Sequence, residues 1–121
     1  MSVQTKNEAR ARRKRRVRKN MHGTAERPRM TVFKSNKHIY VQVIDDDRGA
    51  TMAASSTLNE SLRGSVKELN KKDAATKVGE AIAEACKAAQ IERVVFDRNG
   101  YPYAGRVAAV ADGARSGGLE L

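Results

Sequence analysis

The chain has 121 residues and a net charge of +10, with 24 Lys and Arg against 14 Asp and Glu. This length suffices for one compact domain with a core and is too short for two domains and a linker. The single cysteine, Cys86, excludes an internal disulfide and a paired-cysteine metal motif, and no apolar run reaches the roughly 18 residues of a membrane span.

The N-terminal segment holds nearly all of the excess positive charge. Residues 1–29 contain eleven bases and two acids, whereas residues 30–121 contain 13 bases and 12 acids. Between Arg10 and Lys19, eight of the ten side chains are cationic, and six of those are arginines. We therefore divide the chain into a basic arm with its linker, residues 1–29, and a globular body, residues 30–121.

The arm has the sequence of a helix from about residue 6 to 20, since residues 5–8 form a capping box. Like charges repel along it and no apolar stripe compensates, so we expect the free helix to fray and to become ordered on a polyanion. The apolar face of a membrane-surface helix is missing, which favours nucleic acid. Six to eight phosphate contacts would give a log-log salt slope of roughly −4 to −7.

Strand patterns open the body. Residues 31–33 and 38–44 predict a hairpin, because apolar and polar side chains alternate around a short polar turn. The run Asp45, Asp46, Asp47 is interpreted as a solvated turn and not as a metal site, because turns select aspartate for its bonds to the backbone. Residues 50–57 predict a weaker third strand, which completes an antiparallel meander.

Helical patterns dominate the second half. Residues 58–72 are ambiguous between a loop and a short helix, and Asp73 is the predicted N-cap of an amphipathic helix over 74–90. The short continuous apolar run at 94–96 predicts a strand buried on both faces, and a helix over 106–116 follows. The predicted fold is α/β: a mixed four-stranded sheet, formed by the three-strand meander and a fourth strand placed parallel by a right-handed crossover, with two packed helices and the basic N-terminal helical arm.

Two further segments of the body are candidate RNA contacts. The loop from Asp97 to Arg106 places Tyr101 and Tyr103 among arginines and glycines, and aromatic rings beside guanidinium groups suit unpaired RNA bases. The alternative is an ordinary loop whose tyrosines cover the edge of the core. The hairpin turn, residues 34–38, is a weaker candidate, since two lysines and a histidine are often merely exposed there.

Two other classes of function compete with RNA binding. An RNase H-like nuclease or phosphotransferase would need converging carboxylates, for which Asp45, Asp97 and Asp112 are poor candidates. A DNA-binding protein without sequence preference would use the same basic arm. Neither histidine has the partners of a catalytic triad and no glycine-rich phosphate loop occurs, so we expect no enzyme activity, cofactor, metal or small-molecule substrate.

The residues resemble a known family. The segment ERPRMTVFKSNKHIYVQVIDD and the block VGEAIAEACKAAQIERVVFDRNGYPYAGRVAAVADGARSGGL are similar to the bacterial large-subunit ribosomal protein eighteen family, whose members bind 5S ribosomal RNA. The likeness spans nearly the whole chain. It departs from the family pattern at Asn99, at Ala104 and in the C-terminal SGGLEL.

The resemblance implies a non-enzymatic structural protein of the cytoplasmic ribosome that helps attach 5S ribosomal RNA to the central protuberance. Large-subunit ribosomal RNA and neighbouring ribosomal proteins would be further partners, and a membrane would not. The RNA-binding residues predicted from the patterns and the resemblance together are Arg10, Arg12, Arg13, Lys14, Arg15, Arg16, Arg18, Lys19, Arg27, Arg29, Lys34, Ser35, Asn36, Lys37, His38, Arg98, Gly100, Tyr101, Tyr103, Gly105 and Arg106.

Overall fold

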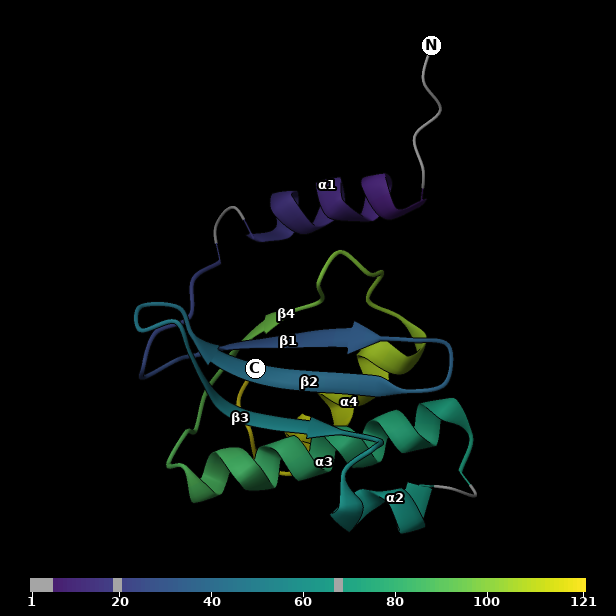
Figure 1. The fold of residues 1–121 in the computed structure, drawn as a ribbon. Helices are drawn as coiled ribbons and strands as arrows, with labels where there is room; N and C mark the ends of the chain where they lie inside the picture. Colours follow the sequence, from purple (N-terminus) through teal and green to yellow (C-terminus); the bar gives the residue numbers. More distant parts are fainter. Residues whose placement is uncertain (1–5, 19–20, 67–68) are drawn as a thin grey trace.

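A computed structural model describes residues 6–18, 21–66 and 69–121. The predicted order of elements is confirmed, and Figure 1 shows the N-terminal helix lying apart from the sheet and the other helices. The elements are α1 (Lys6–Arg18), β1 (Arg29–Lys34), β2 (Ile39–Asp45), β3 (Ala50–Ser56), α2 (Glu60–Val66), α3 (Lys71–Ala88), β4 (Val95–Asp97) and α4 (Gly105–Ser116).

The sheet is mixed and its strands lie in the order β3-β2-β1-β4. Strands β1 and β2 pair antiparallel, with Phe33 opposite Tyr40, and β2 pairs antiparallel with β3. Strand β4 pairs parallel with β1, so that Thr31 lies opposite Asp97. The meander and the parallel fourth strand are therefore both confirmed, although β4 is an edge strand with half-buried Val95 and Phe96, not a strand buried on both faces.

Helices α3 and α4 lie on one side of the sheet (Figure 1). Alternation along β1 and β2 directs one set of apolar side chains toward these helices and the other set away from them. The resulting core is small and aliphatic, and among the described residues no helix packs against the opposite face of β1 and β2 as α3 and α4 pack against the core face. Its fully buried members include Met30, Val32, Ile39, Val41 and Val43 from the sheet, Val78, Ile82 and Cys86 from α3, and Val107 and Val110 from α4.

The cysteine is a core residue. Cys86 is fully buried, and burial raises the pKa of its thiol to about 11. A thiol in this environment stays protonated and unreactive at neutral pH.

The start of α3 differs from the prediction. Asn70 is the N-cap, and its side chain accepts a hydrogen bond of 2.8 Å from the backbone N–H of Asp73. Asp73 lies instead in the first turn, where its negative charge is favourable next to the helix dipole. The prediction that Asp73 caps the helix is therefore wrong, because an equally good capping residue precedes it by three positions. The ambiguous segment, residues 58–72, contains α2 and the first two residues of α3; residues 67–68 lie outside the described residues.

Glycines bring α3 and α4 into close contact. A Cβ atom placed on Gly79 would lie 2.2 Å from the carbonyl oxygen of Val110, and one on Gly113 would lie 2.2 Å from the carbonyl oxygen of Thr76. Real Cβ atoms do not approach a backbone this closely. The two helices can therefore be this near only because both positions lack a side chain.

We expect Gly79→Ala to lower the free energy of unfolding by about 2 kcal/mol, because forcing the helices apart costs more than the gain in helix propensity. Gly64→Ala is the matched control, since a Cβ on this helical glycine of α2 meets no atom within 4 Å. That control should be neutral or stabilising. Urea denaturation of the three proteins measures the difference, and a Gly79→Ala variant as stable as wild type would contradict the close contact.

Candidate nucleic-acid interface

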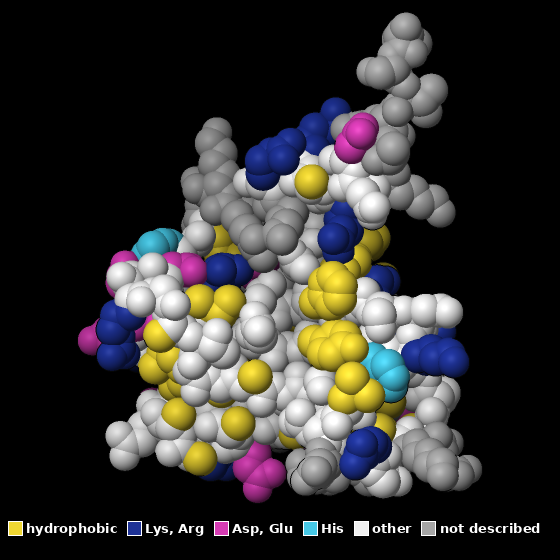
Figure 2. Space-filling view, viewed as in Figure 1, with side chains coloured by type: hydrophobic (Ala, Val, Ile, Leu, Met, Phe, Trp, Pro, Cys, Tyr) yellow, Lys and Arg dark blue, Asp and Glu magenta, His cyan; other side chains and the backbone are white. Residues whose placement is uncertain are grey.

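Helix α1 displays cations along its length. Arg12, Arg13 and Arg15 are exposed and Arg10 is half-buried, and Figure 2 shows Lys and Arg side chains above the sheet. Glu8 is the one acid in this helix. The side chains of Lys14, Arg16 and Arg18, and the whole of Lys19, are outside what the structure describes.

The helix is fastened to the loop between β4 and α4. Arg10 donates a hydrogen bond to the hydroxyl of Tyr101, and its guanidinium carbon lies 4.8 Å from the centre of that ring. Arg13 donates a hydrogen bond of 3.1 Å to the carbonyl oxygen of Gly100. Two predicted segments that are about 90 positions apart in the sequence are therefore neighbours in the structure.

Tyr101 also contacts the end of β1. Its hydroxyl lies 3.4 Å from both the backbone nitrogen and the carbonyl oxygen of Lys34, and the Lys34 ammonium group lies 5.0 Å from the centre of the ring. Tyr101 is buried, with 8% of its surface exposed. In this arrangement its ring holds two cations in place by cation–π contact and is not open for a base to stack on.

Arg106 joins the hairpin turn to the same loop. Its guanidinium donates a hydrogen bond of 2.9 Å to the carbonyl oxygen of Ser35. Helix α1, the turn at residues 34–38 and the loop at residues 97–106 thus form one continuous surface, which we call the basic ridge. Asn36 and Lys37 are exposed at its end, whereas His38 is half-buried and its Nδ1 lies 2.9 Å from the hydroxyl oxygen of Thr57.

The remaining residues of the loop differ in exposure. Tyr103 is 47% exposed, packs edge-on against Phe96, and accepts a hydrogen bond of 3.0 Å from Arg115. Arg98 is half-buried and Gly100 is buried. Gly105 is exposed and has a φ of 55°, a left-handed conformation that glycine adopts without strain.

Arg29 has partners within the protein. Its guanidinium donates two hydrogen bonds to Asp46, of 2.9 and 3.0 Å, and one of 2.7 Å to Asp97, which is fully buried. Asp46 also accepts a bond of 2.7 Å from the backbone N–H of Gly23, which ties the linker to the body. These contacts give Arg29 a structural role, and we do not include it in the basic ridge. Arg27, by contrast, is exposed.

The prediction that Asp45, Asp46 and Asp47 form a solvated turn is wrong for the first two of these side chains. Asp45 is buried, accepts hydrogen bonds from the backbone N–H groups of Asp47 and Arg48, and forms an ion pair with the Arg48 side chain. Asp46 faces Arg29. Adjacent aspartates do point in different directions, as expected, but each has a basic partner, and the partner of Asp47 is His22, whose Nε2 lies 2.6 Å from its Oδ1. The local sequence of a turn does not reveal these partners.

Asp46 should make stability depend on acid pH. The hydrogen bonds from Arg29, followed by that from Gly23, lower the pKa of Asp46 to about 2. Because this is below the usual value near 3.9, the contribution is complete above about pH 4 and is lost as the pH falls through 2. Asp46→Asn should lower the free energy of unfolding at neutral pH by about 1 kcal/mol, allowing for solvent screening of the charge. Urea denaturation between pH 2 and 7 should then show a flatter profile for Asp46→Asn than for wild type; identical profiles would contradict this role.

The carboxylates that a nuclease would need do not converge. Asp45 and Asp97 are engaged with Arg48 and Arg29 respectively, and Asp112 is exposed on α4. Within residues 6–18, 21–66 and 69–121, no group of three His, Cys, Asp or Glu side chains could hold a metal ion. In the same ranges, no helix combines the length and the apolar character that crossing a bilayer requires.

Two aromatic residues next to the basic ridge were missed by the sequence analysis. Phe33 is 48% exposed, and Tyr40 is its cross-strand neighbour. The signal was present in the alternation of the hairpin, where Val32, Ile39 and Val41 point into the core and these two rings point the other way.

Comparison with known proteins gives a consistent result. Residues 4–121 match the family model for ribosomal L18 of archaea, bacteria, mitochondria and chloroplasts. The chain is 59% identical to large ribosomal subunit protein uL18 of Myxococcus xanthus over 97% of its own length and 98% of that protein's. It is 60% identical to uL18 of Sorangium cellulosum, over 93% and 94% of the two chains. With uL18 of Herpetosiphon aurantiacus it shares 56% identity over the full length of both.

Proposed function

The chain belongs to the L18 family of ribosomal proteins, and from this premise we propose that it binds 5S ribosomal RNA and helps attach it to the central protuberance of the large subunit. As a member of this family it is a structural constituent of the large ribosomal subunit and not an enzyme. We further propose that it acts in the ribosome of the cytoplasm, where large-subunit ribosomal RNA and adjacent ribosomal proteins are its other partners.

The observation that carries the proposal is the basic ridge. Arg10 and Arg13 are anchored to the loop at Tyr101 and Gly100, which orients α1, while Arg12 and Arg15 project from the same helix and are exposed. A helix held in this way presents a row of guanidinium groups to a polyanion, and arginine binds phosphate oxygens in pairs. Residues 30–121 are nearly neutral. The body therefore adds little charge of its own, and its contribution is to orient α1.

The experiment is a gel-shift titration of the full-length protein over a salt series, with bacterial 5S ribosomal RNA and with duplex DNA of equal length. We expect tighter binding of the RNA at every salt concentration, because the ridge is a fixed shape and not only a charge. Equal affinities for the RNA and the DNA would instead indicate a protein that binds nucleic acid without preference for RNA or for sequence. Incubation of the RNA with the protein and Mg²⁺ should leave it intact, and cleavage would support the nuclease alternative.

A further inference from the structure

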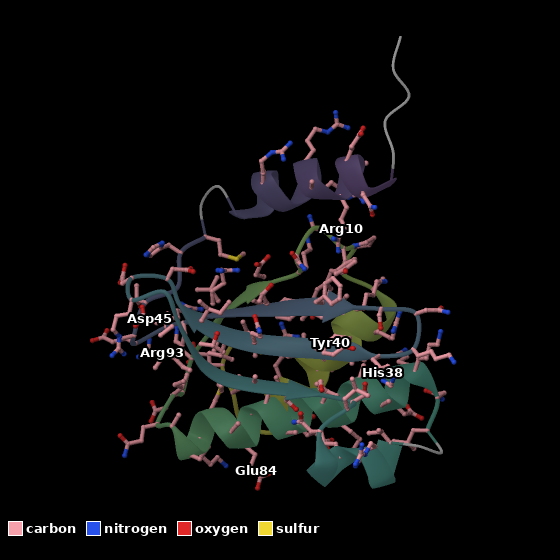
Figure 3. All side chains as sticks on the ribbon, viewed as in Figure 1. Arg10, His38, Tyr40, Asp45, Glu84 and Arg93 are labelled. Atoms are coloured by element: carbon pink, nitrogen blue, oxygen red, sulfur yellow. The ribbon has the colours of Figure 1, made fainter. Side chains whose placement is uncertain are left out.

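One face of the sheet is open and hollowed. A groove of about 590 Å³ lies over β1 and β2, and its lining includes Thr31, Phe33, Tyr40, Gln42 and Ile44. We call this set of five residues the open face. Its volume is within the range of small-molecule binding sites, about 300–1,000 Å³, and Figure 3 shows Tyr40 on the sheet below Arg10 of α1.

An aromatic pair dominates the open face. The ring centres of Phe33 and Tyr40 are 5.9 Å apart with an angle of 43° between their planes. Phe33 is 48% exposed, although smaller apolar residues of the same strands are fully buried. Because Phe33 is half exposed and lines the groove, part of its ring is accessible to a flat partner.

Polar and charged groups surround this pair. Gln42 is exposed and, among the described residues, no hydrogen bond joins its side-chain amide to another residue. The groove is bordered by Arg29, and Lys34 follows Phe33 in β1, with its ammonium group beside the Tyr101 ring. The open face is therefore continuous with the basic ridge and carries aromatic, amide and cationic groups together.

We propose that the open face binds an unpaired base of the same RNA that the basic ridge binds, with Phe33 and Tyr40 as the stacking surface and the Gln42 amide directed to a base edge. The inference rests on the proposed function and adds a second mode of contact to it. Exposed aromatic side chains on a sheet stack unpaired bases, and amide groups bond to base edges. The groove has cations at its border and the polar residues Thr31 and Gln42 within it. These groups complement a nucleotide better than they complement the apolar surface of a protein partner.

The test is a titration of 5S ribosomal RNA with wild type, Phe33→Leu and Phe33→Trp over a salt series. Phe33→Leu keeps an apolar side chain but removes the ring, so affinity should fall by about tenfold, within the range of stacking on one base. Phe33→Trp should restore binding. The salt slope should be the same for all three proteins, because no charge is changed. Leu58→Ala is the control, since Leu58 is 45% exposed and does not line this groove.

The outcomes separate this inference from the proposed function. If wild type fails to bind the RNA, the proposed function fails. If wild type binds and Phe33→Leu binds equally well, the open face does not stack a base and the inference is overturned, including the case in which the face docks a protein. A reduced salt slope for Phe33→Leu would also overturn it, because the substitution would then have disturbed phosphate contacts. Ultraviolet cross-linking of the wild-type complex should give an RNA adduct on a peptide that contains Phe33 or Tyr40.

Discussion

Replacement of Arg10, Arg12, Arg13 and Arg15 together by glutamine should weaken binding of 5S ribosomal RNA by about 10²- to 10³-fold at physiological salt. Each guanidinium that neutralises a phosphate releases condensed counterions, and the slope of log affinity against log salt changes by about 0.7–0.9 for each one. The slope of the variant should therefore be shallower by about 3. Glutamine is a good helix former, so α1 itself should be preserved.

The control for this variant uses cations on another surface. Lys77 and Lys87 are exposed on α3, and Lys77 has an acidic neighbour one turn away at Glu80. Lys77→Gln with Lys87→Gln should alter the salt slope little, because neither residue belongs to the basic ridge. A similar loss in both variants would show that affinity follows net charge and not the position of the arm.

Arg29→Met should lower the free energy of unfolding by about 3 kcal/mol. The substitution leaves Asp97, which is fully buried, and Asp46 without the guanidinium that bonds to both. Removal of one partner from a buried ion pair costs this much because the remaining charge is not compensated. Thermal and urea denaturation measure the effect, and the melting temperature should fall by more than 10 °C.

Arg27→Met is the matched control for this second prediction. Arg27 is exposed and lies two positions away, and its hydrogen bonds in the linker are made by its backbone: the N–H donates to the Thr24 hydroxyl and the carbonyl oxygen accepts from the Thr24 N–H. Its replacement should change stability by less than about 0.5 kcal/mol. If Arg29→Met were as mild as Arg27→Met, the bridge that Arg29 makes from Asp46, just after β2, to Asp97 in β4 would contribute nothing to the stability of the fold.

The order of elements was predictable because most of them have a strong local signal, β3 and α2 being the weaker ones. The hairpin alternates over β1 and β2, α3 has a wide apolar stripe, and the charge run begins with a capping box. The ends of the elements were less predictable. Asn70 and Asp73 are both good N-cap residues, and the local sequence does not show which of them begins α3.

The site was predictable in its parts but not in its assembly. The charge run, the tyrosine loop and the hairpin turn were each identified, whereas their junction through Tyr101 depends on how β4 is placed beside β1. The same long-range placement gives Arg29 its two carboxylates. Burial of Tyr101 and exposure of Phe33 could not be separated by residue type, because both are aromatic residues with a basic residue within three positions in the sequence.

A map of the assembled large subunit by electron microscopy tests the central claim most directly. We expect the guanidinium groups of Arg12 and Arg15 to lie within hydrogen-bonding distance of 5S ribosomal RNA phosphates, with the body holding α1 against the RNA. A map in which these side chains face solvent or another protein, with no phosphate near α1, would contradict it.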